Sequence, residues 1–183
     1  MKPVNLTKPD AGFAFAHLAL EGDASGVLRK NYNFFEQLFL NQMPYCVMIS
    51  KDVWEDTGGY DTTMRHGYED WEFSVRIGGR GKFGVVAPEP LFHYRVREAG
   101  MLKSLSNTMH GQLWSEIQQR NSALYRLPAL VGTWWRWRRR PSSYPLALYF
   151  GWLAIHRILP NFLFSALFRR ILPFSKSQRL GAQ

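Results

Sequence analysis

Two adjacent carboxylates, Glu69 and Asp70, have the residue type and position for proton transfer. They follow Gly67 and open a segment whose apolar spacing predicts a helix that Gly78 and Gly79 close. In a first helical turn, backbone N–H groups and the helix dipole favour ionised carboxylates, so we expect the carboxyl pKa to be lowered there. A fixed carboxylate can take the proton of an attacking hydroxyl, which indicates general-base chemistry. The alternative is that both acids only complement the helix dipole.

A second group with chemical potential lies on a predicted strand over residues 91–97. The alternation of this strand gathers His93, Arg95 and Arg97 on one face. One imidazole and two guanidiniums suit a metal ion, a diphosphate or an acidic ligand. The alternatives are a histidine that is merely hydrogen-bonded or solvent-facing and an arginine edge that discourages strand pairing.

Short strands and helices with clear boundaries surround these side chains. Strands are predicted over 12–20, 45–49, 82–87 and 91–97, with a turn at 88–90. Helices are predicted over 31–40 and, behind a Ser50 cap, over 51–56, before the helix that Glu69 and Asp70 open. We expect both sets of candidate residues to be positioned by these elements.

Several side chains are expected in the interior of this part of the chain. Trp54 and Trp71 are predicted core residues, and Cys46, within an apolar run, is a predicted buried small hydrophobe. Glu72 and Arg76 are spaced to form an ion pair on the outer side of their helix. Because Cys46 is the only cysteine, disulfide scaffolds and cysteine-ligated zinc sites are excluded.

Five short motifs follow one another between residues 41 and 95. They are Asn41-Gln42-Met43-Pro44, Lys51-Asp52-Val53-Trp54, Gly58-Gly59-Tyr60-Asp61, Gly67-Tyr68-Glu69-Asp70-Trp71-Glu72 and Pro90-Leu91-Phe92-His93-Tyr94-Arg95. In this order and spacing they resemble the second half of a family 2 glycosyltransferase catalytic domain. The resemblance covers roughly residues 11–105.

The resemblance implies a GT-A type α/β fold, in which a nucleotide-sugar-binding half precedes an acceptor-binding half. It implies inverting transfer of a sugar from a nucleotide-sugar to a hydroxyl acceptor, such as a growing cell-surface glycan or its lipid-linked precursor. On the matching positions, Asp70 is the expected general base and Glu69 positions the acceptor. The expected substrate-binding residues are Trp71, His93, Arg95 and Arg97, and His93 is also a candidate metal ligand.

The sequence also departs from the family pattern. The family holds Mg²⁺ or Mn²⁺ with an Asp-x-Asp motif, which occurs nowhere in this chain. We therefore expect the nucleotide-binding half to be missing, neither Mg²⁺ nor Mn²⁺ to be bound by this chain alone, and little transferase activity without a separate nucleotide-binding chain. A histidine is frequent in the family where Arg97 stands. The alternative is a non-catalytic, truncated or split-gene module that binds a membrane surface, a partner chain or a second copy as a homodimer.

The positive charge of the chain is concentrated in its second half. Residues 1–100 hold 13 acids and 11 Lys/Arg, whereas residues 101–183 hold 12 Lys/Arg and one acid, Glu116. The first residues lack the apolar run of a secretory leader, so a cytoplasmic location is expected. A near-neutral body and a cationic tail need separate explanations.

The tail combines arginine with apolar and aromatic residues. A helix is predicted over 107–127, stopped by Pro128. The cluster that follows suits a membrane interface and consists of Trp134, Trp135, Arg136, Trp137, Arg138, Arg139 and Arg140. The apolar runs 146–155 and 162–168 are each too short to span a bilayer, which favours helices lying in the interface of an anionic membrane. The alternatives are a soluble hairpin closed on the body or on a second copy, and nucleic-acid binding, which the dense apolar neighbours disfavour.

These expectations together describe an incomplete GT-A-like, or nucleotide-diphospho-sugar transferase, half-domain of the α/β class with a mixed short sheet and an amphipathic helical tail. The expected division is an acceptor half over 1–105, a connecting amphipathic helix over 106–133 and a basic aromatic tail over 134–183. The expected location is cytoplasmic, peripheral on the inner face of the membrane.

Overall fold

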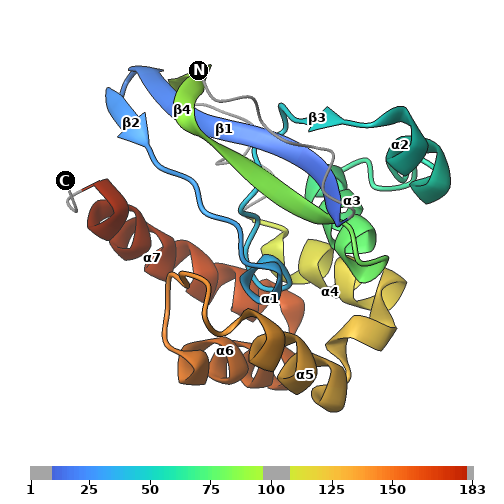
Figure 1. The fold of residues 1–183 in the computed structure, drawn as a ribbon. Coiled ribbons are helices and arrows are strands. Elements are labelled where there is room, and N and C mark those ends of the chain that lie inside the picture. Colours follow the sequence, from blue (N-terminus) through green and yellow to red (C-terminus); the bar gives the residue numbers. More distant parts are fainter. Residues whose placement is uncertain (1–9, 97–107, 181–183) are drawn as a thin grey trace.

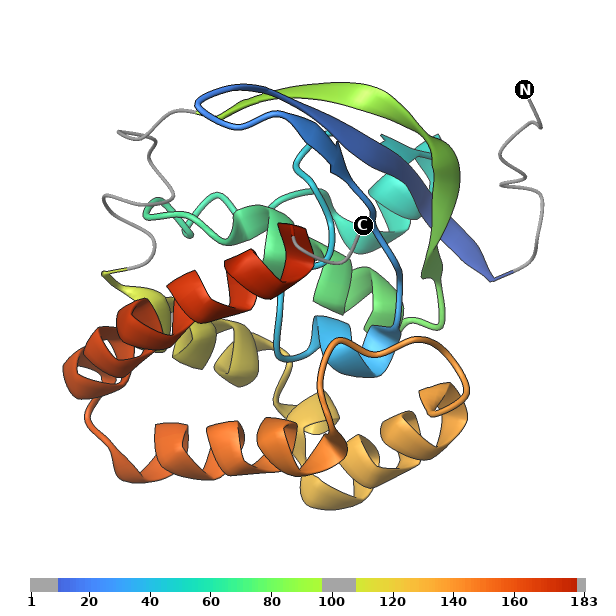
Figure 2. The same ribbon diagram turned by 90° about the vertical axis from the view of Figure 1, so that its left-hand side faces the viewer.

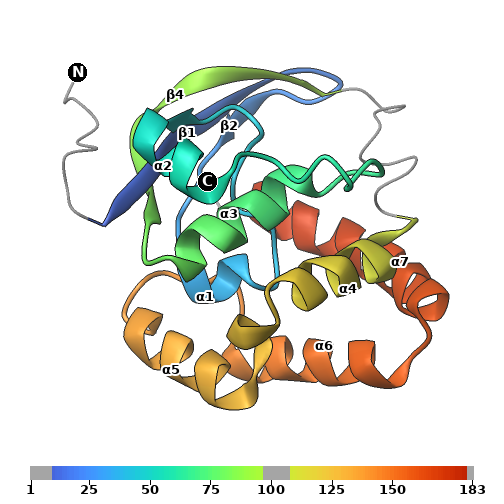
Figure 3. The same cartoon turned by 90° about the vertical axis from the view of Figure 1, so that its right-hand side faces the viewer.

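The computed structural model describes residues 10–96 and 108–180, with side chains up to residue 171. It is a mixed α/β structure in which a small sheet lies over a layer of helices (Figure 1). The expected α/β class is confirmed at this level. In all three views the helices α5 and α6 lie farthest from the sheet (Figures 2 and 3).

The sheet is built around one long strand, β1 (Ala11–Gly22). β4 (Phe83–Val96) runs parallel to β1 along its length, while β2 (Gly26–Leu28) and β3 (Met48–Ile49) pair with β1 in the antiparallel sense. The sheet is therefore mixed, as predicted. The strand expected over 45–49 is shorter, with only its last two residues in β3.

The turn predicted at residues 88–90 is wrong, because β4 continues through both prolines. Ala87 pairs with Ala16 and Phe92 pairs with Leu18, so the residues between Ala87 and Phe92 stand opposite a single residue of β1. This bulge accommodates proline, which lacks the N–H that a regular ladder requires.

Helices in the first half fit their predicted positions to different extents. α2 (Lys51–Thr57) begins behind Ser50, whose hydroxyl accepts from the N–H of Val53 at 3.4 Å, and α3 (Glu69–Gly79) begins at the predicted acids. α1 (Phe34–Gln37) is one turn instead of the ten residues predicted.

In the second half, the predicted helix over 107–127 divides into separate elements. α4 (His110–Arg120) ends at Asn121, and a 3-10 turn, η2 (Ser122–Tyr125), leads into α5 (Leu127–Trp137). Pro128 stands in the first turn of α5, where a missing N–H breaks no helical hydrogen bond, so the prediction that it stops a helix is wrong. α6 (Leu146–Ile158) and α7 (Asn161–Leu180) complete the fold.

One hydrophobic core joins the two halves of the chain. Phe13 of β1, Trp71 of α3, Trp114 of α4 and Phe164 of α7 all belong to it and are at most 2% exposed. Side chains from the first and the second half of the chain therefore share one core. Among the described residues, no helix is both long and apolar enough to cross a membrane.

Two predictions about buried side chains are wrong. Cys46 is exposed, because the apolar run that contains it forms only the two-residue strand β3. Trp54 is 39% exposed, with its ring against Tyr60 and Phe73 at the edge of the core.

Candidate functional site

The predicted acids lie at the start of α3, after an unusual backbone turn. Gly67 has φ of 108° and Tyr68, the residue before the helix, has φ of 67°. A left-handed backbone is costly for a tyrosine and requires support from its surroundings. The Tyr68 hydroxyl hydrogen-bonds Nδ1 of the buried His110 at 2.9 Å, and its ring packs edge-on against Trp71. The helix start is thus fixed by contacts with α4.

Asp70 is half-buried and held at both carboxylate oxygens. The N–H of Trp71 donates to Oδ1 at 2.7 Å, and the Asn41 amide donates to Oδ2 at 3.3 Å. Asn41 belongs to the first of the five motifs, although its spacing gave no indication of this contact. Both hydrogen bonds restrict the carboxylate to one orientation.

The direction of the Asp70 pKa shift is opposite to the prediction. Burial, followed by the adjacent Glu69 carboxylate, raises the pKa of Asp70, and the two hydrogen bonds only partly offset this. The expectation from the helix dipole is wrong here because desolvation is the larger effect. A higher pKa makes the ionised carboxylate a stronger base.

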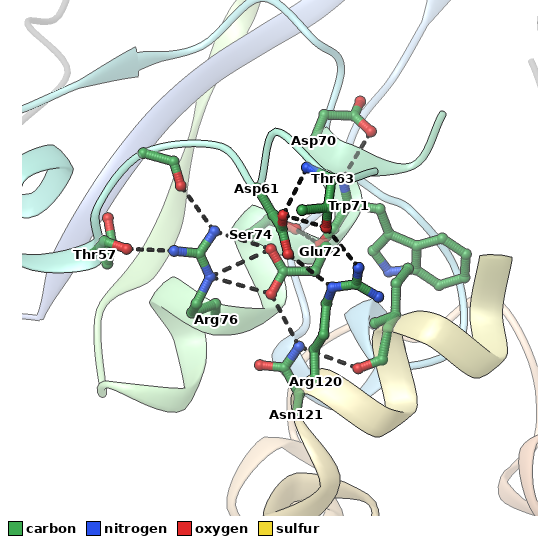
Figure 4. A network of polar contacts seen from close by, with 12 residues as sticks. Thr57, Asp61, Thr63, Asp70, Trp71, Glu72, Ser74, Arg76, Arg120 and Asn121 are labelled. Carbon is green, nitrogen blue, oxygen red and sulfur yellow. Dashed lines mark hydrogen bonds and ion pairs between the residues drawn. The ribbon is translucent and has the colours of Figure 1, made fainter. Parts of the chain in front are cut away.

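A network of polar contacts lies beside this helix start (Figure 4). Arg120 of α4 donates to the Asp61 carboxylate at 2.8 Å and to the Thr63 hydroxyl at 2.9 Å. The Thr63 hydroxyl in turn donates to Asp61 at 2.6 Å. Hydrogen bonds from Thr63, then from Arg120, lower the pKa of Asp61 well below its usual range, so it stays ionised.

The predicted pair of Glu72 and Arg76 forms, at 2.9 Å, but not on an outer side. Glu72 is 2% exposed and also accepts from the Asn121 amide at 3.2 Å, while Arg76 donates to the backbone carbonyls of Thr57 and Gly59. The outer position was wrong because α4 and the loop after α2 cover this side of α3. A buried charge requires such partners.

The network borders an open hollow of about 350 Å³, whose lining residues are Gly58, Tyr60, Asp61, Glu72, Arg76 and Arg120. The charged groups of its wall are paired with one another. Neither Glu69 nor Asp70 lines this hollow. Burial raises the pKa of the Tyr60 hydroxyl, and the negative charges of Asp70 and Glu69 raise it further.

The other predicted substrate-binding residues lie elsewhere. Trp71 is 2% exposed and donates its indole N–H to the Gln37 carbonyl at 2.6 Å, which makes it a core residue. His93 and Arg95 are exposed on β4, and His93 Nδ1 contacts Glu21 at 2.7 Å. Arg97 lies outside the described residues.

The basic residues of β4 and the acids of α3 do not face each other. Phe92 and Tyr94 are half-buried and pair with Leu18 and Leu20, whereas the intervening His93 is exposed on the other face of the strand. Within the described ranges, no three His, Cys, Asp or Glu side chains lie together as metal ligands.

A second hollow of about 510 Å³ was not predicted. Its lining residues are Ser115, Gln118, Gln119, Ser122, Tyr125, Arg126, His156 and Arg157, none of which is an acid. We call it the α4–α6 hollow. Sequence spacing gave no signal for it, because its walls come from two segments that are 30 residues apart.

The α4–α6 hollow contains a serine and a histidine in contact, but not as a catalytic pair. His156 Nε2 lies 3.0 Å from the Gly111 carbonyl, which only accepts, so Nε2 carries the proton. Nδ1 accepts from the Gln118 amide at 3.2 Å. Burial lowers the pKa of His156 and keeps it neutral. Nε2, 3.2 Å from Ser115 Oγ, therefore has no lone pair with which to take the serine proton.

The Trp–Arg cluster is divided between the core and the surface. Trp137 packs edge-on against Tyr32 and Phe83, and Trp134 is half-buried, whereas Trp135 is 59% exposed. Four exposed arginines of the cluster are Arg136, Arg138, Arg139 and Arg140. Of the three indoles predicted to lie at a membrane interface, only Trp135 is exposed at the surface.

Comparison with known proteins yields no relative: no family model, no curated protein and no solved structure matches this chain.

Proposed function

We propose that this chain supplies the acceptor side of a GT-A-like sugar transfer, with Asp70 as the general base. The observation that carries the proposal is the state of Asp70, a half-buried carboxylate that Asn41 and a backbone N–H orient and whose pKa burial raises. Carboxylates whose pKa is shifted by burial and which are held in one orientation are candidates for catalytic positions. The ordered motifs between residues 41 and 95 add the family context.

In this proposal Asp70 takes the proton of the acceptor hydroxyl as its oxygen attacks the anomeric carbon of a nucleotide-sugar. The bond from that carbon to the diphosphate breaks, and configuration inverts. Glu69 positions the acceptor and raises the basicity of Asp70 through its own charge. His93, Arg95 and Arg97 remain candidate diphosphate-binding residues, but none is given a role in this transfer. His93 and Arg95 lie on a face away from Asp70, and Arg97 lies outside the described residues.

The described residues do not offer a divalent-metal site. The sequence lacks Asp-x-Asp, and the part of the chain that the structure describes contains no cluster of metal-ligating side chains. No step is therefore derived through Mg²⁺ or Mn²⁺. The donor nucleotide and its metal are assigned to a separate nucleotide-binding chain.

A second candidate function is a non-catalytic binding module, attached to a membrane surface or to a partner chain. It is favoured by a specific observation: neither described hollow is lined by Glu69 or Asp70. For both candidates we propose a peripheral location on the inner face of the membrane, where lipid-linked acceptors are presented.

A transfer assay tests the catalytic proposal. The chain is added to detergent extracts of its native membranes with radiolabelled nucleotide-sugars, and incorporation into lipid or polymer is measured. Asp70→Asn is expected to reduce incorporation about 10²–10⁴-fold, the usual contribution of a general base. Asp52→Asn, an exposed acid in the first turn of α2, is the matched control.

Two outcomes count against this function. Incorporation by Asp70→Asn equal to that of the wild type removes Asp70 from the reaction. Tight Mn²⁺-dependent binding of UDP or GDP by the chain alone, measured by isothermal titration, contradicts the assignment of the donor site to another chain.

A further inference from the structure

The helix α6 lies at the surface without a polar face. Its inner side is buried through Tyr149, Leu153 and His156. Its exposed residues, apart from Arg157, are Ala147, Leu148, Gly151, Ala154, Ile155 and Ile158. A surface helix normally presents charged or polar residues to water, and a helix that is apolar all round is normally covered.

The neighbouring helices extend this apolar surface. On α5, Leu127, Val131 and Trp135 follow one another at intervals of four and are 60%, 47% and 59% exposed. At the start of α7, Phe162 and Leu163 are 70% and 45% exposed. We call these residues, with the exposed apolar residues of α6, the apolar face. Large apolar side chains exposed in such number on successive helices favour an interaction surface.

The helices that carry the apolar face also carry positive charge. The exposed arginines of α5 to α7 and their flanks are Arg126, Arg136, Arg138, Arg139, Arg140, Arg157, Arg169 and Arg170. No acid follows Glu116 in the sequence. The guanidinium of Arg138 lies 3.5 Å over the exposed Trp135 ring, which keeps an aromatic and a cation together at the surface. An anionic partner is thereby favoured, and two copies joined through this face would repel each other.

The lining of the α4–α6 hollow adjoins the apolar face along the chain. Two of its lining residues, Arg126 and Arg157, directly precede Leu127 and Ile158, which are 60% and 79% exposed. Arg157 donates to the Tyr125 carbonyl at 3.3 Å, which holds its guanidinium at the wall. Two guanidiniums with amide and hydroxyl neighbours and no carboxylate form a suitable environment for a phosphate.

We propose that the apolar face lies in the interface of an anionic phospholipid bilayer, with a headgroup phosphate held in the α4–α6 hollow by Arg126 and Arg157. Apolar side chains reach the acyl boundary while the arginines stay at headgroup depth. The inference deepens the proposed peripheral attachment and rests on that part of the proposed function, not on sugar transfer.

Flotation of the full chain with lipid vesicles tests the inference. The wild type is expected to bind vesicles of phosphatidylcholine with phosphatidylglycerol, and to bind pure phosphatidylcholine much more weakly. Since one cation near an anionic surface contributes about fivefold in affinity, Arg126→Gln with Arg157→Gln is expected to weaken binding roughly 25-fold. The matched control, Lys51→Gln with Arg80→Gln, removes the same charge from α2 and the end of α3 and is expected to change affinity about twofold.

A second pair of variants tests the apolar face. Leu148→Ser with Ile155→Ser is expected to weaken vesicle binding about tenfold or more, since both side chains leave water on docking. The control, Val27→Ser with Met48→Ser, changes exposed apolar residues of the sheet and is expected to leave binding unchanged. Circular dichroism melting establishes that each variant folds, and Arg126→Gln alone replaces the double variant if that one does not fold.

Several outcomes overturn the inference. Equal binding by the hollow variant and its control removes the phosphate site. Inorganic phosphate bound as tightly as vesicles makes free phosphate the ligand. If the chain is retained more strongly on oligonucleotides than on vesicles at the same salt, nucleic acid is the partner. If the chain is a dimer and the double variant Leu148→Ser with Ile155→Ser dissociates it, a second copy covers the apolar face. None of these readouts requires a sugar donor, so loss of the Asp70 assignment leaves them unchanged.

Discussion

Two phenylalanines at the start of α7 allow the stability of the protein and its vesicle binding to be tested separately. Phe164 is fully buried, with its ring centroid 4.5 Å from that of Trp152, 4.6 Å from that of His156 and 5.8 Å from that of Trp114. Phe162, two residues earlier, is 70% exposed on the apolar face. We expect Phe164→Ala to lower the free energy of unfolding and Phe162→Ala to lower vesicle binding.

The magnitude follows from the burial of Phe164. A buried phenylalanine removes about 150–250 Å² from water, which corresponds to about 4–6 kcal/mol at about 25 cal/mol per Å². Measured Phe→Ala substitutions in cores cost about 3–5 kcal/mol, and we expect that range. For a domain of this size the melting temperature is then lowered by about 6–20 °C. Phe162→Ala is expected to change stability by less than about 0.5 kcal/mol.

Urea unfolding followed by circular dichroism gives both free energies, and flotation with phosphatidylglycerol vesicles gives the second readout. If Phe164→Ala and Phe162→Ala destabilise the protein equally, α7 does not pack on α4 as described. If Phe162→Ala binds vesicles like the wild type, Phe162 does not belong to the contact surface.

Burial and Glu69 raise the pKa of Asp70, so ionising this carboxyl opposes folding. The contribution of Asp70 to the free energy of unfolding is therefore present below its ordinary pKa and is lost as pH rises through the raised pKa. Asp70→Asn is therefore expected to increase the free energy of unfolding at neutral pH in urea, whereas a loss of about 0.3–1 kcal/mol would indicate a helix-dipole role. Burial lowers the pKa of His110 to about 3 from 6.5, so its contribution to stability falls by about 1.4 kcal/mol per pH unit below pH 6.5. His110→Phe is expected to remove that slope between about pH 6.5 and pH 5, and an unchanged slope would contradict the burial of a neutral imidazole. A Cβ at residue 78 would lie 2.0 Å from Cε2 of Phe34, so Gly78→Ala is expected to destabilise by about 1–3 kcal/mol in thermal unfolding, and Phe34→Leu to restore part of the loss.

Local sequence signals predicted the elements whose ends depend on neighbouring residues. The serine cap of α2, the start of α3 at Glu69 and the strand β1 were predicted from capping, charge and apolar pattern alone. These features depend on contacts within a few residues, so a short stretch of sequence contains the necessary information.

Elements that depend on distant partners were predicted poorly. Pro88 and Pro90 indicated a turn, yet β1 supports a continuous β4 by leaving a bulge opposite them. Pro128 indicated the end of a helix. The predicted helix is instead interrupted earlier, at η2, and Pro128 lies in the first turn of α5. Proline excludes certain hydrogen bonds, but only the neighbouring elements decide whether those bonds were needed.

The sequence by itself determined the charge division of the chain, with one acid after residue 100, and the placement of two carboxylates in one helical turn. Only the tertiary structure decided that burial raises the pKa of Asp70, that Trp137 belongs to the core while Trp135 is exposed, and that Arg126 and Arg157 share a hollow. The physical reason is that charge and short-range order are properties of the chain. Desolvation and side-chain exposure depend on which distant segments pack against each residue.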